Sequence, residues 1–144
     1  MKNKIIIIAG DPNSINSEII SKVWKKTNNS IKKKLYLIAN YNLIKEQFKK
    51  IKSQIPIFKI EKLKDDTKKI RLKIIDVPLT FKDPFKVSLT ASKKYLLDCF
   101  NLAHGMAQSR VIKGFINCPI DKKLLGNTKS VGVTEFLASK CQIK

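Results

Sequence analysis

The chain opens with a run of four isoleucines that ends at a glycine, and this run constrains the fold more than any other feature. The segment Lys4–Ala9 contains four consecutive β-branched isoleucines, which is typical of a strand buried in a sheet. It leads directly into Gly10–Glu18, whose Gly, Pro, Asn and Ser residues favour a tight turn into a helix. A strand followed by such a turn and a helix begins a crossover unit, so the sequence predicts an α/β fold with a mainly parallel sheet and crossover helices.

The rest of the chain continues the alternation of strands and helices. The two most apolar strands, Ile5–Ala9 and Val111–Asn117, are predicted to be buried neighbours or near-neighbours. The charged stretch Glu61–Lys69 contains no Gly or Pro, and we interpret it as a solvated connection rather than a domain boundary. The other predicted strands are Leu35–Ala39, Ile55–Ile60 and Leu72–Val77. The first predicted helix covers residues 17–26 and has Ser14, Asn16 or Ser17 as its N-cap, and a second begins at the N-cap Asn42. The third runs from Thr90 or Ser92 to about Met106, and the fourth is Glu135–Lys140.

The net charge of +19 raises the possibility of a nucleic-acid partner, but the type of basic residue argues against it. Arg71 and Arg110 are the only arginines among 30 basic residues, whereas nucleic-acid sites favour the bidentate guanidinium. Abundant Lys, Ile and Asn fit a genome rich in A and T. We therefore expect no nucleic-acid partner, although a basic field would still attract small phosphorylated substrates.

The cysteines and the hydropathy indicate a reduced, cytoplasmic protein with no membrane partner. Cys99, Cys118 and Cys141 are far apart and form no CxxC pair, so zinc is not indicated and free, mostly buried thiols are expected. The apolar run Ile5–Ala9 is too short for a signal-peptide core, and no segment approaches the length of a membrane span.

A second group of polar residues follows the last predicted strand. Asn117-Cys118-Pro119 ends that strand, Lys122 follows at once, and Thr134-Glu135 opens a helix after a polar loop. A hydroxyl at a helix start and a nearby lysine suit an anionic ligand. Composition favours the interpretation of Lys122 as one more solvated lysine, and Thr134 is equally explained as a plain N-cap.

These motifs, in this order and spacing, resemble the 4-hydroxythreonine-4-phosphate dehydrogenase family of pyridoxal phosphate biosynthesis. The family pattern is G-[DE]-P after the first strand, T-x-P-[IV]-x-K after a later strand, and G-H-T-E a short loop beyond. The corresponding segments here are Gly10–Pro12, Asn117–Lys122 and Gly132–Glu135. The resemblance covers essentially the whole chain but only the amino-terminal part of a family member.

The resemblance implies a fold like that of isocitrate and isopropylmalate dehydrogenases, present here in part. Residues 1–144 would form the amino-terminal segment of a larger two-domain α/β dehydrogenase, with no internal boundary. The implied enzyme is a homodimer that oxidises 4-phosphooxy-L-threonine with NAD or NADP and a divalent metal such as Zn, Mg or Co. Its keto-acid product then loses carbon dioxide.

The match is incomplete at the residues that contact substrate in the family. Thr134 corresponds to the family threonine, but Val133 stands at the family histidine and Asn117 at a usual threonine. The family's metal ligands lie beyond the position of Lys144, and His104, the single histidine, cannot build that site alone. We identify no catalytic residue in this segment, and the expected substrate-binding positions are Thr134, Val133 and, more weakly, Lys122. The alternative is a catalytically inactive binding or interaction module that retains the fold. If the chain is instead the dehydrogenase segment, its incomplete sheet would expose an edge and an apolar face where the rest of the fold would pack.

Overall fold

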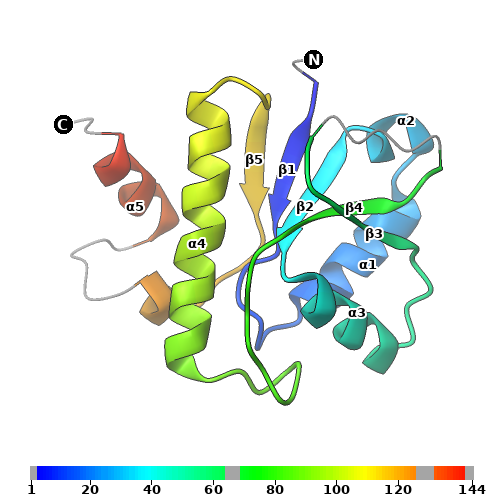
Figure 1. Cartoon of the computed structure of the whole chain (residues 1–144), viewed down its shortest axis with the longest axis horizontal. Coiled ribbons are helices and arrows are strands. Elements are labelled where there is room, and N and C mark those ends of the chain that lie inside the picture. Colours follow the sequence, from blue (N-terminus) through cyan, green and yellow to red (C-terminus); the bar gives the residue numbers. More distant parts are fainter. Residues whose placement is uncertain (1–2, 64–68, 126–131, 142–144) are drawn as a thin grey trace.

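The computed structural model describes residues 3–63, 69–125 and 132–141 as a five-stranded sheet with helices on both faces (Figure 1). The elements in chain order are β1 (Ile5–Ile8), α1 (Asn16–Lys26), α2 (Asn29–Lys32), β2 (Leu35–Ala39), α3 (Tyr41–Lys50), β3 (Ile57–Ile60), β4 (Leu72–Asp76), α4 (Leu89–Gln108), β5 (Gly114–Asn117), the 3-10 turn η1 (Lys122–Leu125) and α5 (Val133–Lys140).

The sheet has the strand order β3-β4-β2-β1-β5, and all four strand pairings are parallel. This confirms the predicted α/β class. It also confirms that the first and last apolar strands are neighbours, since Ile5 lies opposite Gly114 and Ile8 opposite Asn117. The strand β1 therefore has β2 on one side and the edge strand β5 on the other.

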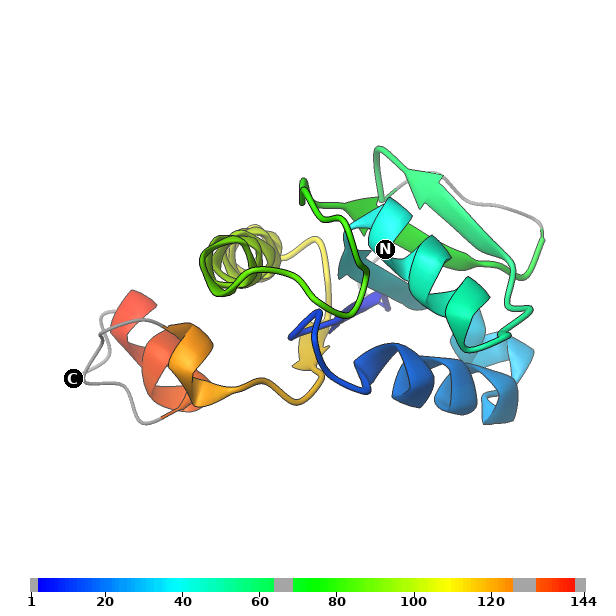
Figure 2. The ribbon, with the colours of Figure 1, turned by 90° about the horizontal axis from the view of Figure 1, so that it is seen from below.

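The two faces of the sheet are covered by different helices because side chains alternate along each strand. Ile6 and Ile8 pack with α4, whereas Ile5 and Ile7 lie on the face of α1 and α3. Figure 2 shows α4 on one side of the sheet and α1 on the other. Right-handed crossovers produce this arrangement, since the connection from β1 to β2 and the connection from β4 to β5 run in opposite directions across the sheet.

The strand β5 differs from its prediction in length and burial. The sequence predicted a buried strand over Val111–Asn117, but the strand covers only Gly114–Asn117 and lies at the edge of the sheet. Val111 is 45% exposed and Ile116 is 60% exposed. An apolar run is typical of a strand in the middle of a sheet, yet the described chain offers β5 a neighbour on one side only.

Two helices begin earlier than predicted because other side chains cap them. The Asn40 side chain accepts a hydrogen bond of 2.9 Å from the Leu43 amide and so caps α3. Ser88 caps α4 in the same way. The sequence had placed these caps at Asn42 and at Thr90 or Ser92.

The last helix is attached to α4 by aromatic packing. The rings of Phe100 and Phe136 lie edge to face with centroids 5.9 Å apart. Leu124 and Leu125 of η1 are buried in the same cluster. The segment after β5 therefore sits beside α4, away from α1 (Figure 1).

The predicted connection Glu61–Lys69 lies in part outside the described residues. Glu61, Lys62 and Lys69 are exposed, as expected for a solvated connection. Leu63 is half-buried and packs against the core.

All three cysteines are free, with Cys99 and Cys118 buried and Cys141 exposed.

Candidate functional site

The loops after β1 and β5 meet at the carboxyl edge of the sheet. The chain leaves β1 toward β2, whereas β5 lies on the opposite side of β1, so the topology reverses between β1 and β5. In open α/β sheets the ligand crevice lies outside the carboxyl ends of the strands at such a reversal. Both motif-bearing loops, Gly10–Ile15 and Cys118–Asp121, follow these two strands.

Gly10 allows the two loops to approach closely. Its φ is +78°, a backbone conformation that glycine adopts without strain. A Cβ at this position would lie 2.8 Å from Asn16 Nδ2 and 3.0 Å from the Pro119 carbonyl oxygen. The glycine of the first motif is therefore required by both its backbone conformation and the contact with the second loop.

Asn16 joins the two loops directly. Its Nδ2 donates a hydrogen bond of 2.7 Å to the Pro119 carbonyl, and the residue is 3% exposed. Its Oδ1 and the hydroxyl of Ser17 are buried without a hydrogen-bond partner among the described residues. The helix α1 begins at Asn16, and its N-cap, Ile15, supplies no side-chain acceptor, so the predicted caps Ser14, Asn16 and Ser17 do not hold that position. Two buried oxygens without partners thus lie next to the loop contact, where the Ser14 hydroxyl accepts a hydrogen bond of 3.2 Å from the first amide of α1.

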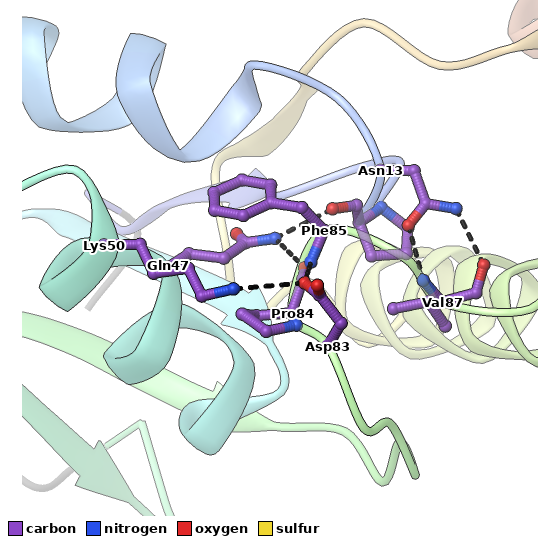
Figure 3. A network of polar contacts seen from close by, with 8 residues as sticks. Asn13, Gln47, Lys50, Asp83, Pro84, Phe85 and Val87 are labelled. Carbon is purple, nitrogen blue, oxygen red and sulfur yellow. Dashed lines mark hydrogen bonds and ion pairs between the residues drawn. The ribbon is translucent and has the colours of Figure 1, made fainter.

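The first loop is also held from the α3 and α4 side, as Figure 3 shows. The Asn13 side chain accepts a hydrogen bond from the Val87 amide and donates one to the Val87 carbonyl, both at 2.8 Å. Gln47 Nε2 donates to the Pro12 carbonyl at 2.8 Å and to the Pro84 carbonyl at 2.7 Å. The loop after β1 is therefore fixed to the segment before α4 through side-chain amides.

Asp83 stabilises the segment that receives these bonds. Its Oδ1 accepts hydrogen bonds from the Phe85 amide at 2.9 Å and from Lys50 Nζ at 3.3 Å (Figure 3). These contacts hold the pKa of the Asp83 carboxyl below its ordinary value, and the hydrogen bond from the Phe85 amide contributes most to this shift. Asp83 is therefore ionised at neutral pH, and it organises the turn before α4.

The residues predicted to bind substrate lie further along the chain, on η1 and α5. Lys122 and Thr134 are exposed, and η1 and α5 contact each other, so the two residues lie on neighbouring elements. The loop between them, 126–131, lies outside the described residues. A shared cleft bordered by Thr134 and Lys122 remains a prediction.

The start of α5 contradicts the interpretation of Thr134 as the N-cap of this helix. Gly132 is the N-cap and the helix begins at Val133, so Thr134 is not a plain N-cap. Val133 is half-buried and packs against the main core. The side chain at the position of the family histidine thus contributes to packing.

The described side chains do not form a metal site by themselves. Among the described residues, no three His, Cys, Asp or Glu side chains gather as they would around a metal ion. His104 Nε2 lies 3.3 Å from the Sγ of Cys141, a pair that links α4 to the end of α5. A catalytic cation needs about three protein ligands, so the described part of the chain does not fit the metal site that the resemblance implies.

Sequence reasoning missed Gln47 and Asp83, the two side chains that organise the first loop. A signal for Gln47 was present: it interrupts the apolar stripe of Leu43, Ile44 and Phe48, and a polar residue on a buried face requires hydrogen-bond partners. No local pattern indicated the hydrogen-bond partners of Gln47, because Pro12 precedes it by 35 residues in the sequence and Pro84 follows it by 37.

The fold is closely similar to that of solved dehydrogenases. A 4-hydroxythreonine-4-phosphate dehydrogenase from Burkholderia phymatum matches 100% of this chain with a TM-score of 0.85 and 21% identity. The enzyme of the same name from Klebsiella pneumoniae matches 99% of the chain with a TM-score of 0.80 and 19% identity. No protein-family model matches the chain, and neither does any curated protein.

The chain spans less than half the length of these structures, 45% and 46% respectively. Within the described residues, no helix is both long enough and apolar enough to cross a membrane. The chain has the α/β fold of one portion of the 4-hydroxythreonine-4-phosphate dehydrogenases, and an amino-terminal portion fits.

Proposed function

We propose that this chain is part of a 4-hydroxythreonine-4-phosphate dehydrogenase. The observation that carries the proposal is the fold match over the entire chain, combined with the three motif segments in family order. The proposed reaction is oxidation of the secondary alcohol of 4-phosphooxy-L-threonine by NAD or NADP. A keto acid results and then loses carbon dioxide. A cytoplasmic homodimer is part of the same proposal.

The share of this chain in that reaction is substrate binding. A net charge of +19 attracts a phosphorylated amino acid, and Lys122 offers a point charge for a phosphate. The Thr134 hydroxyl, exposed in the first turn of α5, can donate a hydrogen bond to a phosphate oxygen. The described residues hold no metal site, and the amides of Asn13 and Gln47 are already engaged, so we assign no step of hydride transfer to this part of the chain.

A second candidate function is a binding or interaction module without catalysis. Val133 favours it, since this half-buried side chain packs in the core and valine carries no hydrogen-bonding group. The contact made by the family histidine would then be absent. The two candidates differ in whether this segment binds the phosphorylated substrate at all.

The deciding experiment measures binding of 4-phosphooxy-L-threonine to the 144-residue chain by isothermal titration calorimetry. We expect measurable binding, weakened about tenfold by Thr134→Ala and unchanged by Thr90→Ala, an exposed threonine on α4. The variant Val133→His should tighten binding because an imidazole can donate a hydrogen bond to a phosphate oxygen.

The same preparations also test catalysis. We expect no oxidation of the substrate with NAD or NADP, even with added Zn²⁺ or Mg²⁺. Absence of binding in both wild type and Val133→His would refute the dehydrogenase proposal and favour the interaction module. Turnover that increases with added metal would show that this segment holds more of the active site than its described residues provide.

A further inference from the structure

His104 and Cys141 place a base next to a nucleophile, on elements other than the two motif-bearing loops. The Nε2 atom of His104, on α4, lies 3.3 Å from the Sγ atom of Cys141, at the end of α5. His104 is half-buried, and Cys141 is exposed. A thiol within hydrogen-bonding distance of an imidazole can give that imidazole its proton when it attacks an electrophile. The pair therefore has the composition and the spacing of an activated thiol.

The packing of α5 on α4 holds the two side chains together. Phe100 lies one helical turn before His104, and its ring meets that of Phe136 edge to face with centroids 5.9 Å apart. The backbone amide of Cys141 donates to two carbonyls of the last turn of α5, each at 3.1 Å. Both helices thus fix the position of the thiol next to the imidazole.

The carbonyl end of α5 makes the imidazole important for the reactivity of this thiol. Cys141 is the C-cap of α5, and the carbonyl groups at a helix C-terminus disfavour a negative charge and favour a positive one. A thiolate at this position therefore needs a neighbouring cation, which His104 supplies once it has accepted the thiol proton. The side chains within one turn of His104 on α4 carry no charge: they are Phe100, Asn101, Ala107 and Gln108.

The other charged groups near the pair are mostly basic. Lys140 precedes Cys141, and Lys122 and Lys123 lie on η1, which contacts both α4 and α5. Glu135, the acidic residue of α5, lies at the opposite end of that helix, roughly 9 Å away along its axis. Together with the net charge of +19, these lysines attract a small electrophile that carries negative charge.

The two remaining cysteines differ from Cys141 in the properties that matter for reactivity. Cys99 and Cys118 are buried, and burial raises the pKa of Cys99 to about 12 and that of Cys118 to about 11. Both thiols therefore stay protonated and shielded at neutral pH, and buried thiols of this kind are inert. The folded chain thus contains two internal references for a reaction at Cys141.

We propose that Cys141 and His104 form a site of reversible modification by small acidic disulfides. His104 Nε2 takes the thiol proton of Cys141 while Sγ attacks one sulfur of the disulfide. The S–S bond of the disulfide breaks, and the departing thiolate receives the proton from the imidazolium. Cys141 is thereby oxidised to a mixed disulfide, and one equivalent of the small thiol is released. This inference goes beyond the proposed function and does not depend on it.

The test follows the reaction of the folded 144-residue chain with glutathione disulfide, which is negatively charged, by mass spectrometry and peptide mapping. At neutral pH we expect one glutathione per chain, attached to Cys141 and removed by dithiothreitol. The variant Cys141→Ser should take up none. The variant His104→Gln should react at least about tenfold more slowly, because it lacks the base. Asn101→Ala, an exposed change one turn away on the same helix, should react at the wild-type rate.

The pH profile separates a chemical role of His104 from a structural one. At about pH 10 hydroxide ionises an exposed thiol without the help of a base. Wild type and His104→Gln should therefore react at the same rate there, although they differ at neutral pH. His104 is half-buried and glutamine retains a hydrogen-bonding group, so circular dichroism should show the same fold for both proteins.

The salt dependence tests the charge of the preferred disulfide. Between about 0.01 M and 1 M salt the Debye length falls from about 30 Å to about 3 Å. The reaction with glutathione disulfide should slow several-fold over this range. The reaction with 2-hydroxyethyl disulfide, which carries no charge, should keep its rate.

Four results would overturn the proposal. Two concern the base: equal rates of wild type and His104→Gln at neutral pH, or a difference between them that persists at about pH 10. The third is modification of Cys99 or Cys118 in the folded chain as fast as that of Cys141. The fourth is the same salt dependence for both disulfides, which would exclude acidic disulfides as the preferred class.

Discussion

Asn16 and Pro119, which lie more than a hundred residues apart, connect the two loops at the carboxyl edge of the sheet. The 2.7 Å hydrogen bond from Asn16 Nδ2 to the Pro119 carbonyl joins the turn after β1 to the turn after β5. It spans the point where the strand order reverses, which is where ligands bind in sheets of this type.

Replacing Asn16 should destabilise the fold. The variant Asn16→Ala removes the 2.7 Å hydrogen bond from this buried side chain to the Pro119 carbonyl, which costs about 0.5–1.5 kcal/mol of unfolding free energy. Urea denaturation followed by circular dichroism measures the loss. The matched control, Asn101→Ala, changes an exposed asparagine on α4 and should be close to neutral. Equal effects of the two variants would show that the loop contact does not contribute to stability.

The two glycines Gly10 and Gly105 should respond to alanine in opposite directions. Gly10→Ala forces an L side chain into a φ of +78° and places Cβ 3.0 Å from a backbone oxygen, so we expect at least about 1 kcal/mol of destabilisation. Gly105 lies inside α4, and apart from its chain neighbours and the backbone of its own helix no atom of the described residues lies within 4 Å of the added Cβ. Gly105→Ala should therefore stabilise by about 0.5–1 kcal/mol. Thermal unfolding of both variants measures the sign, and a stabilising Gly10→Ala would contradict the described loop conformation.

Gln47 should be essential for the position of the first loop. Gln47→Glu replaces the amide that donates to the Pro12 and Pro84 carbonyls with a carboxylate facing both oxygens. The residue is 3% exposed, so burial of an unpaired charge should destabilise the protein by several kcal/mol at neutral pH. Gln108→Glu, at the exposed end of α4, serves as the control. The loop contact would be disproved if urea denaturation gave the same midpoint for both variants.

Stability should fall at alkaline pH because of the buried thiols. Burial raises the pKa of Cys118 from 9.0 to about 11 and that of Cys99 from 9.0 to about 12. Above pH 9 the unfolded chain releases these protons while the folded chain keeps them, so the stabilising contribution is lost as pH rises from 9 toward 12.

The variant Cys118→Ala isolates one of these thiols. Between pH 9 and 11 its unfolding free energy should decrease less steeply than that of the wild type. Cys141→Ala, which removes an exposed thiol, should keep the wild-type slope. Parallel curves for wild type and Cys118→Ala would show that Cys118 ionises equally in both states.

The sequence of α4 specifies its buried face, whereas the sequence of β5 did not specify its burial, for a common reason. Tyr95, Leu96 and Phe100 recur at helical spacing, and that periodicity alone places them on one face, where they are buried. Ile116 belongs to an equally apolar run, yet its burial depends on whether another element covers β5. Periodicity specifies which side chains share a face, but it does not specify what lies opposite that face.

The sequence by itself determined the class of the sheet, the order of its main elements and the positions of its two motif-bearing loops. These follow from local rules: β-branched runs form strands, Gly and Pro end them, and parallel strands require crossovers. Only the tertiary structure decided that Asn16 would bind the Pro119 carbonyl, that Gln47 would join Pro12 to Pro84, and that Ile116 of β5 would stay exposed. Those contacts join residues tens of positions apart, and they depend on how the crossovers place each helix over the sheet, which no local segment of the chain encodes.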